Sequence, residues 1–324
     1  MSHAARNSSP EILTFGEAMA MFIAEAPGPL AEAEAFQRRL AGADNNVAIG
    51  LTRLGYHVGW LSRVGKDSFG HFIRQALIHE GVDGRYIITD PARPTGLLFK
   101  ERTRDGADPR VEYFRCGSAA SALSPTDAEQ IDFSALRHLH ATGITPALSD
   151  SARALTRQLM IQAREHGATV SFDPNLRPTL WPSEAVMRET LNELAGLADW
   201  VLPGLTEGRL LTGEESPEAI ADAYLARGAK GVIIKLGPEG SYYRGRLGAT
   251  LESCEVPGKP VAQIIDTVGA GDGFAVGAIS ALLEGLSPEE ALRRGNLVGA
   301  EAVQVVGDME GLPTRARLQA LENA

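Results

Sequence analysis

The residues best suited to chemistry lie in one glycine-rich segment, residues 266–272 (DTVGAGD). The segment follows a predicted strand at 263–265 and leads into a predicted helix that ends at residue 283. Main-chain N–H groups at a helix start are unpaired and attract anions. Gly269, Ala270 and Gly271 have little or no side chain, so a phosphoryl group can approach their backbone closely. The carboxylate of Asp272 can cap the helix or accept a proton.

Two common phosphate-binding motifs are excluded, because the chain has no G-x-x-x-x-G-K-[ST] and the glycine spacing is not G-x-G-x-x-G. A tight turn with a capped helix is the ordinary alternative for an isolated glycine turn. Here, three small residues and an acid converge where a strand passes into a helix. Ligands of open α/β sheets bind at the carboxyl ends of strands. We therefore interpret residues 266–272 as a site for an anionic group.

Two arginines are candidates for recognising a second anion. Arg115 follows Tyr113 at the end of a predicted strand region, and Arg177 lies just past a predicted strand at 169–172. A guanidinium presents a planar fork that matches a carboxylate bidentately. The alternative is a surface arginine paired with a local acid, the more common case.

The elements that must position these residues alternate between short β-branched runs and helical periods. This pattern predicts an α/β fold with a mostly parallel sheet covered by helices. The predicted strands and helices are 44–54, 57–64, 68–80, 138–142, 151–166, 169–172, 184–194, 200–202, 206–226, 231–235, 241–243, 274–283 and 288–305.

Two early stretches, 18–23 and 97–114, interrupt this alternation. They predict either a small antiparallel β lid over one end of the sheet or two ordinary edge hairpins. With the lid, insertions at about 17–40 and 95–116 belong to a single domain over 11–324. Residues 1–10 have no apolar signal region and are interpreted as a flexible leader.

Composition limits the possible partners. The chain of 324 residues has 41 acidic and 31 basic residues, a net charge of −10, which disfavours nucleic-acid binding. No stretch approaches eighteen consecutive apolar residues, so no membrane span is expected. Two cysteines, Cys116 and Cys254, cannot form a disulfide framework and agree with a reducing cytoplasm. We expect a cytoplasmic protein with small-molecule ligands.

The segment 266–272 resembles the C-terminal signature of the ribokinase-like (PfkB) carbohydrate kinases. Residues 42–48 (GADNNVA), followed by Leu54-Gly55, resemble the N-terminal signature of that family, and 64–70 matches a further family element. The resemblance extends from about residue 12 to 313 in the expected order. It implies a ribokinase-like three-layer sandwich with a β lid, and transfer of the γ-phosphoryl of ATP to a sugar hydroxyl.

The same resemblance implies roles for individual residues. Asp272 would be the base, and the amides of Gly269, Ala270 and Gly271 would form the anion hole. The nucleotide would be contacted by Lys235, Gly237, Gly240 and Asn296. Glu207 matches the acid of the family's magnesium element, although Gly204 replaces its asparagine, and a monovalent cation such as K⁺ is expected beside Asp266. Lids of this family often pair between subunits, which implies a homodimer.

Two runs narrow the sugar. Residues 113–121 (YFRCGSAAS) and 173–181 (DPNLRPTLW) are similar to those of 2-keto-3-deoxygluconate kinases, which form the 6-phosphate, whereas fructokinases as a rule share only the second run. The resemblance implies that the sugar acid is contacted by Gly42, Asn46, Tyr113, Arg115 and Arg177. The related 2-ketogluconate kinases have nearly the same pattern, and fructokinase is the next alternative. A catalytically silent sugar sensor is disfavoured, since it would not need Asp272.

Overall fold

The computed structural model describes residues 9–103, 109–246 and 250–323, so most of the predicted leader lies outside the described residues. The main sheet has the strand order β13-β12-β11-β10-β9-β8-β1-β4-β5. The strands from β11 to β5 are parallel, and β12 and β13 are antiparallel additions at one edge. Their bounds are β1 Ile12–Phe15, β4 Val58–Gly65, β5 Ile87–Asp90, β8 His138–Thr142, β9 Thr169–Asp173, β10 Trp200–Val201, β11 Gly231–Lys235, β12 Gly240–Gly245 and β13 Glu252–Pro257.

Helices cover both faces of this sheet, because side chains alternate along each strand. In β1, Leu13 packs into one hydrophobic core and Ile12 into the other. The first core is covered by α3 (Thr145–Leu148), α4 (Asp150–Glu165), α5 (Glu184–Gly196), α6 (Leu205–Thr212) and α7 (Pro217–Ala226). The second is covered by α1 (Ala43–Arg53), α2 (Ser68–His79), α8 (Ala270–Leu283), α9 (Pro288–Ala302) and α10 (Arg315–Glu322). The three layers confirm the predicted fold class.

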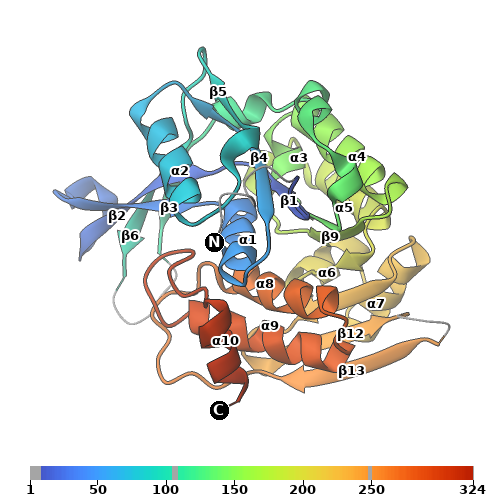
Figure 1. Cartoon of the computed structure of the whole chain (residues 1–324). Coiled ribbons are helices and arrows are strands. Elements are labelled where there is room, and N and C mark those ends of the chain that lie inside the picture. The colour runs from blue at the N-terminus through green and yellow to red at the C-terminus, as the bar shows by residue number, and fades with distance from the viewer. Residues whose placement is uncertain (1–8, 104–108, 247–249, 324) are drawn as a thin grey trace.

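A second sheet of four strands, here called the lid, projects from the helix-covered body at the left of Figure 1. Its order is β3 (Phe36–Ala41), β2 (Met19–Pro27), β6 (Leu97–Arg102) and β7 (Val111–Phe114). The β2–β3 and β6–β7 pairs are antiparallel, whereas the central β2–β6 pair is parallel. The two interrupting stretches therefore form a sheet of their own and are not edge hairpins of the main sheet.

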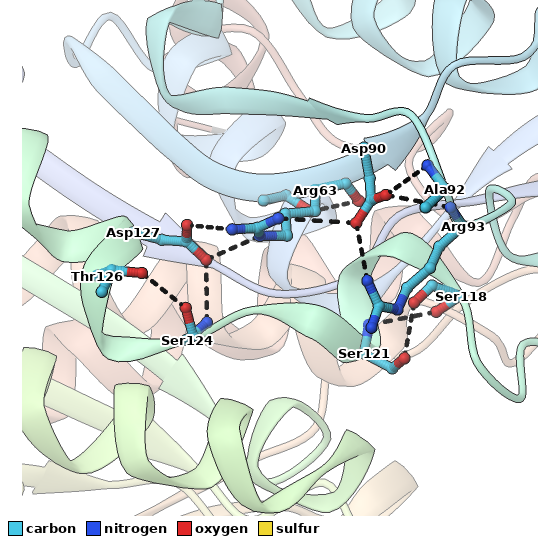
Figure 2. Close-up of polar contacts among 10 residues, drawn as sticks. Arg63, Asp90, Ala92, Arg93, Ser118, Ser121, Ser124, Thr126 and Asp127 are labelled. Atoms are coloured by element: carbon cyan, nitrogen blue, oxygen red, sulfur yellow. Dashed lines mark hydrogen bonds and ion pairs between the residues drawn. The ribbon is translucent and has the colours of Figure 1, made fainter.

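Ion pairs fix the connections that lead into and out of the lid (Figure 2). Arg63 on β4 forms two hydrogen bonds with Asp127, of 2.9 and 2.7 Å, and its Nη1 lies 3.6 Å from Asp90. Asp90 ends β5 and accepts the N–H groups of Ala92 and Arg93 at 2.8 and 3.1 Å. Bidentate arginine–carboxylate pairs define geometry as well as charge. The network therefore anchors the root of the lid to the body.

Three boundary predictions are wrong. Residues 263–265 form no strand, and the sheet edge is instead occupied by β13, which pairs with β12. Ile264 and Ile265 are 45% and 41% exposed, so a short apolar run was mistaken for a buried strand. Helix α8 begins at Ala270 and not at the predicted residue 274. Helix α9 ends at Ala302 and not at about residue 305. None of the helices in the described ranges is both long and apolar enough to cross a bilayer.

Candidate active site

A cavity of about 330 Å³ lies between the lid, the carboxyl ends of strands β8, β9 and β11, and the start of α8. Parallel strands direct their carboxyl ends to one edge, which is why loops from distant parts of the chain meet there. Nine of the residues singled out from the sequence line the cavity: Gly42, Tyr113, Arg115, Arg177, Glu207, Lys235, Gly269, Gly271 and Asp272.

Asp272 lies in the first turn of α8, and its side chain is buried. Asn46, from the first half of α1, donates a hydrogen bond from Nδ2 to Asp272 Oδ2 at 2.8 Å. Burial raises the pKa of Asp272 to about 6, the nearby Asp173 carboxylate also raises it, and the Asn46 hydrogen bond opposes both. Such a carboxylate is ionised at neutral pH yet more basic than an exposed aspartate, which suits a general base.

The glycine-rich turn has a backbone shape that requires glycine at one position. Gly269 is the N-cap of α8 with φ +81°, and a Cβ there would lie 2.2 Å from the main-chain oxygen of Asp308. A Cβ on Gly271 would lie 3.6 Å from Lys235 Nζ, so the lysine ammonium is close to the helix start. Ala270 begins the helix but does not line the cavity. Helix N–H groups and an ammonium thus face the same space.

Lys235 and Asp173 form an ion pair across the ends of β11 and β9, with 2.6 Å between Nζ and Oδ2. Burial alone would lower the pKa of Lys235, but the carboxylates of Asp173 and Glu207 hold it above its ordinary value. The ammonium therefore stays charged. Asp173 lies in the run 173–181 but was not singled out from the sequence; the available signal was its position directly after the predicted strand at 169–172.

Arg115 and Arg177 have different partners. Arg115 Nε donates to Glu17 Oε2 at 2.6 Å, and Ser118 Oγ donates to the other oxygen of Glu17. All three side chains are buried, so Glu17 balances the Arg115 charge. Arg177 donates to the main-chain oxygen of Leu176 at 2.8 Å, and within the described residues no acid forms an ion pair with it. Arg177 is thus the cation available to an acidic ligand.

Six predicted site residues do not line this cavity: Ala270 and Asn46, which adjoin it, and Asn296, Gly240, Gly237 and Asp266. Asn296 donates to the main-chain oxygens of Val256 and Pro257 at 3.2 and 3.1 Å, which ties α9 to β13. Gly240 is required where β12 meets β13, because a Cβ would lie 2.1 Å from the oxygen of Val256. Gly237 opens the turn between β11 and β12. Asp266 accepts a hydrogen bond from Lys100 Nζ of the lid at 2.5 Å.

Glu207 lines the cavity but also caps its own helix. Its two oxygens accept the N–H groups of Leu176 at 2.8 Å and Gly204 at 2.7 Å. Among the described residues, no group of three or more His, Cys, Asp or Glu side chains is arranged for a metal ion.

The chain is similar to known proteins over nearly its whole length. It is 52% identical to a 2-dehydro-3-deoxygluconokinase of Bacillus subtilis (97% of this chain, 96% of the relative) and 32% identical to one of Thermoproteus tenax (97% and 94%). A crystal structure of a PfkB protein from Polaromonas sp. JS666 superposes with a TM-score of 0.88 at 50% identity, covering 96% of this chain and 100% of that one.

Two further similar structures are ligand complexes. A putative Ribokinase II from E. coli in complex with ATP and Mg²⁺ has 28% identity and a TM-score of 0.86, with 97% and 99% of the chains covered. A Vibrio cholerae fructokinase double mutant in fructose, ADP and potassium ion bound form has 28% identity and a TM-score of 0.82, with the same coverage. A model of the pfkB family carbohydrate kinases matches residues 9–315. The chain therefore belongs to the pfkB family of carbohydrate kinases.

Proposed function

We propose that the protein is an ATP-dependent kinase that phosphorylates 2-dehydro-3-deoxygluconate, also called 2-keto-3-deoxygluconate, on its 6-hydroxyl. The observation that carries this proposal is one cavity that contains both a buried carboxylate of raised pKa, Asp272, and an arginine without an acidic partner among the described residues, Arg177. The 52% identity to the Bacillus subtilis 2-dehydro-3-deoxygluconokinase supports the same substrate.

Asp272 would accept the proton of the sugar hydroxyl as its oxygen attacks the γ-phosphorus of ATP. The new O–P bond forms while the bond to the leaving ADP oxygen breaks, and the proton ends on the Asp272 carboxylate. Asn46 holds one carboxylate oxygen at 2.8 Å and leaves the other free for the hydroxyl. Closure of the lid over the bound sugar would exclude water, which limits hydrolysis of ATP.

The start of α8 would stabilise the transferring phosphoryl group. Three small residues, Gly269, Ala270 and Gly271, place helix N–H groups and the positive end of the helix dipole at this point. Lys235 adds a positive charge beside Gly271, held in place by Asp173. Fixed dipoles and charges of this kind stabilise charge that develops in the transition state.

The carboxylate of the substrate would bind to Arg177. Arg115 would lie beside it, with its own charge paired with Glu17. Because Glu17 balances Arg115, a two-arginine clamp would carry a net charge closer to +1 than to +2. Arg115 lines the cavity and is proposed as a further sugar contact, while its Nη2 already forms an ion pair with Glu17. Gly42, Asn46 and Tyr113 are proposed as the remaining sugar contacts.

ATP and Mg²⁺ are the proposed co-substrate and cofactor, as in the similar E. coli protein. Bound Mg²⁺ neutralises phosphate charge, and it is usually held by one or two carboxylates with phosphates and water. Glu207 and Asp173 are the carboxylates beside Lys235 that fit this limited role. Gly237, Gly240 and Asn296 would shape the nucleotide region through β12 and β13, since the Asn296 amide is already engaged with the backbone.

A cytoplasmic homodimer that pairs through the lid is part of the proposal, as is a single domain over 11–324. The lid has an aromatic cluster in which Phe22 stacks on Phe99 and Phe114 lies edge-on to Phe99, and Phe22 also contacts Phe69 of α2. Phe114 is 59% exposed. Light scattering tests the pairing: wild type should have twice the chain mass and Phe114→Asp should shift towards one chain. A wild-type monomer at micromolar concentration contradicts it.

The substrate is tested by measuring initial rates with ATP and a panel of acceptors: 2-dehydro-3-deoxygluconate, 2-ketogluconate, fructose and ribose. We expect the highest kcat/KM for 2-dehydro-3-deoxygluconate. A higher kcat/KM for 2-ketogluconate would keep the acid-binding role of Arg177 but change the substrate. A higher kcat/KM for fructose than for either acid would contradict that role.

A further inference from the structure

One lysine of the lid is buried against the body of the protein. Lys100 lies two residues after Leu98 in β6, so both side chains belong to the inner face of the lid, where Leu98 lines the cavity. Lys100 is 3% exposed, and its Nζ lies 2.5 Å from Oδ2 of Asp266. Burying an ammonium without a partner is strongly unfavourable, so this position of the lid depends on the carboxylate.

Asp266 in turn holds the glycine-rich turn. Its Oδ1 accepts the N–H of Val268 at 3.2 Å, and its Oδ2 faces the N–H of Gly307 at 3.5 Å. The residue after Gly307 packs its main-chain oxygen against Gly269. The Lys100 ammonium therefore lies where the two loops that shape the start of α8 meet.

A second carboxylate belongs to the same junction. Asp308 is buried, and its Oδ1 has no hydrogen-bond partner among the described residues. Burial raises the pKa of Asp308 to about 7, while the positive charge of Lys100 acts in the opposite direction. The Lys100 ammonium therefore interacts with two neighbouring carboxyl groups, Asp266 and Asp308, on either side of the turn.

The family resemblance led us to expect a monovalent cation beside Asp266, and the residues present do not fit one while the lid is in this position. The ammonium has the charge of such an ion and already binds the carboxylate. A second cation at the same carboxylate would be repelled by the first. The charge of the Asp266 carboxylate is therefore balanced without an added ion.

We propose that Lys100 is a positioning residue that supplies the positive charge at Asp266, so that the kinase works without added potassium and couples the position of its lid to the shape of the anion hole. The coupling follows from the topology, because Lys100 comes from β6 and Asp266 from the turn, 166 residues later. The proposal rests on the kinase function proposed above but not on which sugar acid is the substrate.

The first test needs no variant. Initial rates are measured with the preferred acceptor and saturating MgATP in potassium, sodium or tetramethylammonium chloride at equal ionic strength. ADP is quantified directly by chromatography, so that no coupling enzyme with its own salt requirement takes part. We expect kcat to agree within about twofold among the three salts. Stimulation of about fivefold or more by potassium would overturn the proposal.

The second test removes the charge with Lys100→Met. Misplacing a catalytic group by about 1 Å costs of order 10²-fold, so we expect kcat in tetramethylammonium chloride to fall ~10- to 100-fold. Potassium or ammonium chloride should raise the kcat of Lys100→Met by about fivefold or more over its value in tetramethylammonium chloride. A purely structural role of Lys100 would not produce this increase. Lys100→Arg should retain most activity, and Lys66→Met, at an exposed lysine outside the site, should behave as wild type.

A third measurement separates failure of this inference from failure of the proposed kinase function. The melting temperature of the ligand-free protein should rise with potassium for Lys100→Met and stay constant for wild type. This comparison decides the role of Lys100 even if no sugar acid is phosphorylated. The proposal is refuted if Lys100→Met has wild-type kcat, or if it is inactive in every salt with a melting temperature that potassium does not change.

Discussion

Replacing Asn46 with alanine should move the acid limb of the pH–rate profile upward. In wild type, Asp272 must be ionised to accept a proton, and burial raises its pKa to about 6. The value of kcat/KM should therefore be constant above pH 7 and fall tenfold for each pH unit below about 6. An exposed aspartate, with an ordinary pKa near 3.9, would keep full activity at pH 5.

The size of the shift follows from one hydrogen bond. Asn46 Nδ2 donates to Asp272 Oδ2 at 2.8 Å and stabilises the charged form. Hydrogen bonds to charged groups contribute roughly 1.5–3 kcal/mol, and 1.36 kcal/mol corresponds to a tenfold change in ionisation. The midpoint in Asn46→Ala should rise by about one pH unit or more. At pH 7 this variant then has at most about half of its base ionised, and raising the pH should restore the ionised form.

The assay is kcat/KM for the sugar acid at saturating MgATP from pH 5 to pH 9, because this parameter reports the ionisation of the enzyme before the acid binds. The matched control is Asn192→Ala, whose side chain bonds to the main chain of Leu211 and not to a group in the cavity. Its midpoint should stay at that of wild type. A midpoint in Asn46→Ala that is unchanged or lower, or a wild-type midpoint near pH 4, would refute this reasoning.

Three further predictions concern the same cavity. Asp272→Asn should reduce kcat by ~10²–10⁴-fold at every pH with little change in KM, since it removes the proton acceptor. If steady-state kinetics give near-normal turnover for this variant, another group is the base. Arg177→Met should raise KM for the sugar acid by ~10- to 100-fold and leave KM for ATP unchanged. The control Arg188→Met, which removes a surface ion pair with Glu184, should alter neither KM. Equal increases of both KM values in Arg177→Met would argue against carboxylate binding. Gly269→Ala should lower the free energy of unfolding, measured in urea, by ~1–3 kcal/mol more than Gly285→Ala. Both glycines have positive φ, but only the Cβ at Gly269 would collide with a backbone atom. Equal losses of unfolding free energy would contradict the contact with Asp308.

Local patterns were sufficient for much of the fold. The helices that begin after Gly42 and Asp67 were predicted to within a few residues, since periodicity and terminal signals lie within each segment. The strand predicted at 263–265 was wrong, because a three-residue apolar run has no feature that separates a buried strand from an exposed loop. That the two interrupting stretches form a separate lid was one of two alternatives, and only pairing of β2 with β6 distinguished them.

Short-range signatures and periodicities were enough to identify the family, the layered α/β architecture and the candidate base Asp272. The tertiary structure decided which charges are already balanced. Glu17 pairs with Arg115 across 98 residues, and Lys100 reaches Asp266 across 166 residues. Neither pair has a local signature, since a salt bridge depends on where packing brings two distant segments together. The same arginine type thus yields one neutralised side chain, Arg115, and one available cation, Arg177.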